Sequence, residues 1–169
     1  MASEIGVQTI QHTNGTDAMT IDSSGRVAQP ALPAWSVKFS SGSYVALPVT
    51  PAIFDTVVVN RGSIYDTSTG VVTIPVAGVY NIIAMVYARV DVNEAIAVRI
   101  MKSTDGGSNY TMETYAYHYP TGVTQIHTTL VNNILLDLNV GDKIRIHVTG
   151  DCDYYTGGQE TRFSGHLVG

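Results

Sequence analysis

Three carboxylates near the end of the chain, Asp151, Asp153 and Glu160, flank the segment 154–159. Carboxylate oxygens beside flexible backbone carbonyls are ligands that Ca²⁺ accepts. Their spacing is not that of an EF-hand loop, so a solvated acidic loop is the favoured interpretation. Calcium is the only cofactor that the residues suggest, and the sequence favours no cofactor at all.

The histidines do not form a recognisable site. His12, His118, His127, His147 and His166 are scattered, and no His-x-x-x-His, Gly-x-Ser-x-Gly or phosphate-loop pattern occurs. His127 and His147 could approach each other across neighbouring strands to bind a metal or sense pH, but their alternation with apolar residues favours solvated strand positions. The sequence nominates no catalytic residue, and we expect a protein that is not an enzyme.

Tyrosines provide the candidate binding surface. Tyr115, Tyr117 and Tyr119 alternate with other residues, so they share one face of a strand. A row of tyrosine rings offers flat apolar area with polar tips, which suits the recognition of a sugar or a protein. A subunit contact or the edge of the core would explain the same row. The predicted ligand-binding residues are Tyr110, Tyr115, Tyr117, Tyr119, Tyr154 and Tyr155.

The elements that must position these residues are β-strands. Apolar residues alternate with polar ones in short runs between Gly, Pro, Asn and Asp, which is typical of an antiparallel sandwich or barrel. Residues 95–102 place Ile96, Val98 and Ile100 on one face, and residues 143–148 do the same with Ile144 and Ile146. The pattern predicts an all-β protein in which these strands are half-buried.

The strand predicted at residues 79–90 is apolar on both faces. Since one face of an antiparallel sandwich strand normally meets solvent, the second apolar face must be covered by something else. A long loop of the same chain would cover it, and so would a neighbouring subunit. The predicted subunit interface contains Val79, Ile83, Met85 and Tyr87.

Composition limits the partners. Only 14% of the residues are charged, against about 25% in an average soluble domain, which suggests surface removed from water by oligomerisation. The formal net charge of -5 and the absence of a basic run argue against nucleic acid and anionic membranes. Cys152 is the only cysteine, so no disulfide can form within the chain. No apolar stretch approaches the ~18 residues that would span a bilayer.

Residues 1–32 differ from the rest, being rich in Thr, Gly, Gln and Asn. The turn signal at 22–25 predicts a small hairpin, and Pro30 and Pro33 predict an extended connector. We therefore expect an attachment segment at 1–32 and a head domain at 33–169. The first segment resembles linkers of tailed-phage fibre and virion proteins, which implies contacts with other virion proteins.

Short signatures in the head domain follow one another in a characteristic order and spacing. The signatures contain Asn60, Gly70, Pro75, Gly78, Tyr80, Gly141, Asp142, Phe163, Ser164 and Gly165. The set resembles the globular head of the complement C1q family, the jelly roll shared with the tumour necrosis factor cytokines, and the resemblance implies that these positions define the fold. The resemblance implies a homotrimeric recognition head. The collagen-like stalk and the cysteines of the animal proteins are missing.

These observations predict a virion structural and adhesion protein: the C-terminal head of a phage tail or head fibre, binding a host-surface glycan or protein. The alternative is a secreted trimeric ligand that binds a receptor protein. A weaker alternative is a fibre-associated polysaccharide depolymerase, whose paired carboxylates would meet only in space. A virion location is expected, with secretion as the alternative.

Overall fold

The computed structural model describes residues 6–15, 17–122 and 125–168, and the regular structure of these residues consists of strands with no helix. The chain divides into two compact units, Met1–Leu32 and Pro33–Gly169. Within the described residues, no helix has the length and apolar character needed to cross a bilayer.

The N-terminal unit is a small antiparallel sheet. Its strands are β1 (Thr9–Gln11), β2 (Asp17–Ile21) and β3 (Val27–Ala28), in the order β1-β2-β3. The Asp22 carboxylate accepts hydrogen bonds from the backbone N–H groups of Ser24 and Arg26, at 2.8 and 3.0 Å. Gly25 supplies the positive φ of 75° that closes the turn. The hairpin predicted at residues 22–25 is confirmed.

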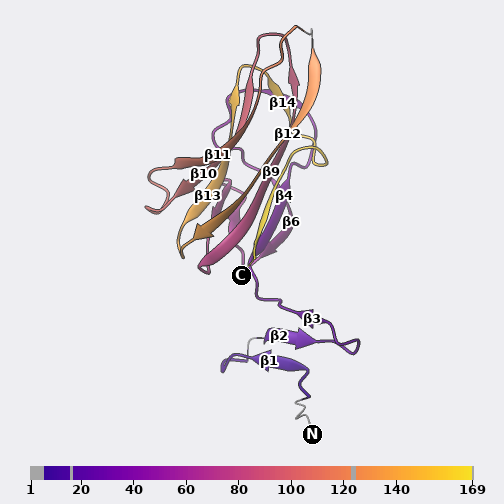
Figure 1. Cartoon of the computed structure of the whole chain (residues 1–169), viewed down its shortest axis with the longest axis vertical. Helices are drawn as coiled ribbons and strands as arrows, with labels where there is room; N and C mark the ends of the chain where they lie inside the picture. The colour runs from indigo at the N-terminus through magenta and orange to yellow at the C-terminus, as the bar shows by residue number, and fades with distance from the viewer. Residues whose placement is uncertain (1–5, 16, 123–124, 169) are drawn as a thin grey trace. The chain divides into compact units, whose positions relative to one another are not determined.

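The second unit is a sandwich of two antiparallel sheets (Figure 1). The first, the β9 sheet, has the order β5-β14-β9-β15-β4-β6, and β12 also pairs with β9. The second, the β10 sheet, has the order β11-β10-β13-β8-β7. The β9 sheet contains β5 (Tyr44–Ala46), β14 (Asp153–Tyr155), β9 (Gly78–Val90), β15 (Arg162–Leu167), β4 (Ala34–Lys38), β6 (Thr56–Arg61) and β12 (Ile126–Leu138). The β10 sheet contains β11 (Thr111–His118), β10 (Ile96–Ser103), β13 (Lys143–Gly150), β8 (Val71–Thr73) and β7 (Tyr65–Asp66).

The core lies between the sheets, where the predicted inward faces meet. Alternate residues of β9 from Tyr80 to Val90 are fully buried, and so are Ile100 of β10 and Ile146 of β13. The Trp35 and Phe163 rings pack edge to face with centroids 5.4 Å apart. The half-buried strands predicted from period-two alternation are confirmed.

Two of the fold-defining positions have a direct physical role. The Asn60 side chain accepts from the backbone N–H groups of Ile64 and Tyr65, at 2.9 and 3.0 Å, and holds the turn after β6. A Cβ at Gly165 would lie 2.3 Å from the ring of Trp35, so this position has no room for a side chain. Cys152 is a buried free thiol, as expected of a structural cysteine.

Candidate binding surfaces

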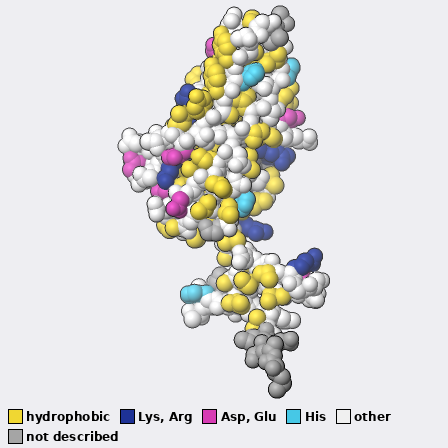
Figure 2. Space-filling view, in the orientation of Figure 1, with side chains coloured by type: hydrophobic (Ala, Val, Ile, Leu, Met, Phe, Trp, Pro, Cys, Tyr) yellow, Lys and Arg dark blue, Asp and Glu magenta, His cyan; other side chains and the backbone are white. Residues whose placement is uncertain are grey.

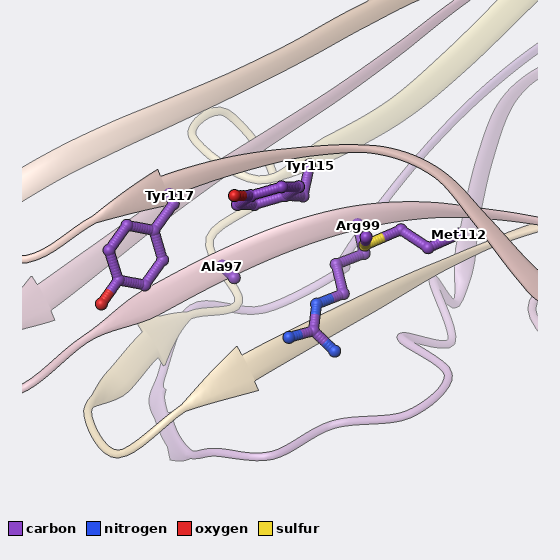
Figure 3. A pocket seen from close by; sticks show the side chains of 5 residues that line it. All are labelled: Ala97, Arg99, Met112, Tyr115 and Tyr117. Atoms are coloured by element: carbon purple, nitrogen blue, oxygen red, sulfur yellow. The ribbon is translucent and has the colours of Figure 1, made fainter.

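A cleft of about 310 Å³ lies on the outer face of the β10 sheet, and we call it the tyrosine cleft. The antiparallel register of β10 and β11 builds it by pairing Arg99 with Tyr115 and Ala97 with Tyr117. Met112 completes the lining. Figure 3 shows both tyrosine rings beside β10 and β11, with the Arg99 guanidinium group extending away from the rings.

The two tyrosines of the cleft are among the most exposed large side chains of the sandwich. Tyr115 is 55% exposed and Tyr117 is 57% exposed. Since rings exposed to this extent carry little of the core packing, they remain available for contact with a partner. The structure therefore places these two predicted ligand-binding residues together, next to a cation that the sequence reasoning did not include.

On the next strand, β13, basic side chains lie beside the tyrosine cleft. His147 of β13 pairs with Arg99, and Arg145 lies on the same face of β13. Burial, followed by the charges of Arg145 and Arg99, lowers the pKa of His147 to about 4. The guanidinium carbon of Arg145 stands 3.5 Å from the centroid of the Tyr110 ring.

The other predicted tyrosines lie elsewhere. Tyr110 is half-buried under Arg145 and lines a separate hollow. Tyr119 is exposed just after β11, where its hydroxyl lies 3.4 Å from the Asn93 side-chain oxygen. The assignment of Tyr154 to a binding surface is wrong, because this ring is only 3% exposed and packs in the core against Phe39.

Tyr155 belongs to an aromatic cluster on the β9 sheet that sequence reasoning did not find. His127 of β12 stacks on Tyr87 of β9 at 5.7 Å, and its Nδ1 lies 2.9 Å from the Tyr87 hydroxyl and 3.3 Å from that of Tyr44. The Tyr155 and Tyr44 ring centroids are 5.0 Å apart. His127 and His147 stand in different sheets, so the less favoured alternative, an approach of the two rings across neighbouring strands, does not occur.

Next to this cluster, the outer side of β9 and β12 forms a second surface, which we call the outer apolar face. It consists of Val79, Ile83, Met85 and Tyr87 of β9 with Val131 and Leu135 of β12. Val131 pairs with Met85, so the two strands present these side chains on one side. Val131 is 56% exposed and Leu135 61%, which shows that the described segments of the chain leave this face open. Figure 2 shows hydrophobic side chains along much of the sandwich in this view, with few charges among them.

Two of the three carboxylates near the end of the chain have separate partners. Asp153 forms a 2.6 Å ion pair with Arg89, and Asp151 accepts a hydrogen bond from the Ala95 backbone N–H. Across residues 6–15, 17–122 and 125–168, no group of three or more His, Cys, Asp and Glu side chains is arranged to hold a metal ion. Asp151, Asp153 and Glu160 are thus not gathered into one cluster in this structure.

Two stacked antiparallel sheets around a shared core define the fold of this unit as a β-sandwich. The model of the C1q domain matches residues 34–168, and the chain belongs to this family. No curated protein matches the chain by sequence.

Solved structures confirm the predicted jelly roll. The chain is similar to the globular domain of zebrafish complement 1qA, with 18% identity, a TM-score of 0.61, and coverage of 81% of this chain and 98% of that one. It is similar to Eiger TNF from S. frugiperda, with 15% identity, a TM-score of 0.68, and coverage of 82% and 94%. Murine APRIL gives 11% identity, a TM-score of 0.62, and coverage of 81% and 99%.

Proposed function

We propose that this chain is a non-enzymatic, homotrimeric binding head, the C-terminal head of a phage tail or head fibre, which attaches to a glycan or protein of the host surface. The observation that carries the proposal is the outer apolar face. Exposed apolar patches of this kind on soluble domains usually mark interfaces. Domains of the C1q and TNF-like type are typically trimeric and extracellular, which supports a second and a third copy as the cover.

The remaining surfaces suit attachment. If the outer apolar face is covered by neighbouring copies, the tyrosine cleft on the opposite sheet stays free for a ligand, and each trimer carries three such clefts. Three weak sites on one rigid body gain avidity without any new contact. The small N-terminal sheet, whose sequence resembles fibre linkers, is the proposed contact with other virion proteins.

Solution mass by light scattering tests the assembly. The expected species has three times the chain mass of 18.1 kDa. Met85→Lys is expected to give a monomer, because it places a charge at the centre of the outer apolar face. Tyr117→Ala, on the other sheet, is the matched control and should remain trimeric. A monodisperse monomer of the unchanged protein would overturn the trimer.

Two assays test the role. Immunogold labelling of purified virions should locate the chain on fibres, and its absence there would contradict the virion assignment. Incubation with host polysaccharide should leave the polymer intact. Release of oligosaccharides would show turnover and contradict a purely binding role.

A further inference from the structure

The three strands β10, β11 and β13 carry an excess of positive charge. Their Lys and Arg residues are Arg99, Lys102, Lys143 and Arg145, whereas Glu113 is their only carboxylate. The excess stands out because the whole chain has a formal net charge of -5. Lys102 is paired with Asp142 at 3.2 Å, so Arg99, Lys143 and Arg145 are the positive charges of these strands that stand outside an ion pair.

The arginines beside the tyrosine cleft form no ion pair with an acidic residue that the structure describes. The ion pairs found in the described part of the chain join Arg26 to Asp22, Arg89 to Asp153 and Lys102 to Asp142, and none includes Arg99 or Arg145. Glu113 lies where the register of β10 and β11 shifts, and Thr111 is its hydrogen-bond partner.

Three side-chain nitrogen atoms around the tyrosine cleft are buried and have no hydrogen-bond partner among the described residues. They are Nε of Arg99, Nε of Arg145 and Nε2 of His147. Arg145 is held against the Tyr110 ring, so it adds positive field. Arg99 lines the cleft with its guanidinium group extending away from the two rings, so pairing with a ligand over the rings requires another rotamer of this side chain. Arginine binds a planar carboxylate through two parallel N–H···O bonds, a geometry that lysine does not provide.

The walls of the cleft indicate which kind of molecule would carry the carboxylate that Arg99 can bind. Tyr115 and Tyr117 present flat rings two residues apart on one strand face, and such rings pack on the apolar face of a sugar. A volume of about 310 Å³ is at the small end of ligand pockets and suits one ring-sized group. An extended acidic peptide would instead add to the free edge of β11, away from the cleft on the sheet face.

We propose that the tyrosine cleft binds a carboxylated sugar residue of a surface glycan, with Arg99 pairing with the carboxylate and Tyr115 and Tyr117 packing on the sugar ring. The inference rests on the proposed function as a glycan-binding head, and it names the class of ligand. Arg145 and His147 support the site from the neighbouring strand.

Calorimetric titration of the full chain tests the proposal with trigalacturonate, sialyllactose and a glucuronate oligosaccharide, each compared with its methyl ester. The ester keeps the sugar and removes the charge. At least one acid should bind at least tenfold more tightly than its ester, because a charged hydrogen-bonded pair is lost. Arg99→Gln should remove this preference, and Arg99→Lys should restore only part of it.

Three variants separate the parts of the site. Tyr115→Ala and Tyr117→Ala should weaken both the acid and the ester, because they remove the surface that packs on the ring. Arg61→Gln removes an equal charge from an exposed position in β6 and should leave binding unchanged. Circular dichroism and solution mass confirm that each variant is folded and assembled as the parent is.

The proposal is overturned if acid and ester bind equally, if Arg99→Gln binds like the parent, or if none of the three acids binds. Binding of a glutamate hexapeptide through Arg99, with no sugar bound, would also overturn it in favour of an acidic protein partner. Binding of the parent head to host cells tests the proposed function separately. If the head binds host cells but shows no preference for acidic sugars, the attachment role stands and only the carboxylated-sugar proposal is overturned.

Discussion

Replacing Tyr65 with phenylalanine removes one buried hydroxyl and leaves the ring in place. This hydroxyl accepts from the backbone N–H of Phe54 at 2.9 Å and donates to its carbonyl at 3.1 Å. Tyr65 is 5% exposed and Phe54 is fully buried. Burial also raises the pKa of Tyr65 to about 12, so the hydroxyl remains protonated and able to donate throughout the working pH range.

The magnitude follows from the two backbone groups that lose their partner. Each buried polar group left without a hydrogen bond costs about 1–3 kcal/mol. We expect Tyr65→Phe to lower the free energy of unfolding by about 2–4 kcal/mol, because the two groups share one residue and local relaxation recovers part of the cost. For a chain of this size, a loss of that order lowers the Tm by roughly 4–16 °C.

Urea unfolding followed by the fluorescence of Trp35 measures the effect, since this is the only tryptophan and it lies in the core. Samples are compared at one protein concentration, so that any coupling to assembly is held fixed. Tyr117→Phe is the control, because it deletes the same hydroxyl from an exposed ring and should change stability by less than about 0.5 kcal/mol. Equal unfolding free energies for the two variants would refute the reasoning.

Three further outcomes are expected. Gly165→Ala should lower the unfolding free energy by at least about 1–3 kcal/mol, since the new Cβ would lie 2.3 Å from the Trp35 ring; an unchanged urea midpoint would contradict this. Cys152 should react with a thiol reagent only after unfolding, because burial raises its pKa to about 12; rapid labelling of the folded protein would be the opposite result. Folding lowers the pKa of His147 from 6.5 to about 4, so between these pH values the unfolded chain is protonated at His147 and the folded chain is not. The free energy of unfolding therefore decreases as the pH falls from about 6.5 to about 4. His147→Gln should therefore lose less stability than the parent between pH 7.5 and pH 4.5, and equal losses would count against it.

The face on which each strand residue lies could be predicted from the sequence, because successive side chains in a strand point to opposite sides. That rule placed Ile96 and Ile100 on one face of a strand, where they are fully buried. The same rule explains the error at Tyr154. Since Tyr154 and Tyr155 are adjacent in β14, only one of them can face outward, and the structure turns Tyr155 to that side.

Contacts between strands could not be predicted, because they depend on register across the sheet. His127 meets Tyr44 and Tyr87 although these residues are far apart in the chain. The positive row at Arg99 likewise forms only when β10 and β13 pair, so it never appears as a basic run in the sequence.

The pairing of β15 with β4 has a consequence for how the head reaches its native state. Trp35 lies in β4, the first strand of the sandwich, and pairs with Gly165 in β15. One edge of β4 therefore has no partner strand until residues 162–167 have left the ribosome. The β6 side of β4 can form much earlier, because residues 56–61 follow closely in synthesis. Closure of the sandwich therefore waits for the synthesis of β15, and contacts of such large sequence separation form slowly. During that interval the nascent sheet exposes Trp35 and an unpaired strand edge. We therefore expect aggregation to be a greater risk during synthesis than after folding is complete.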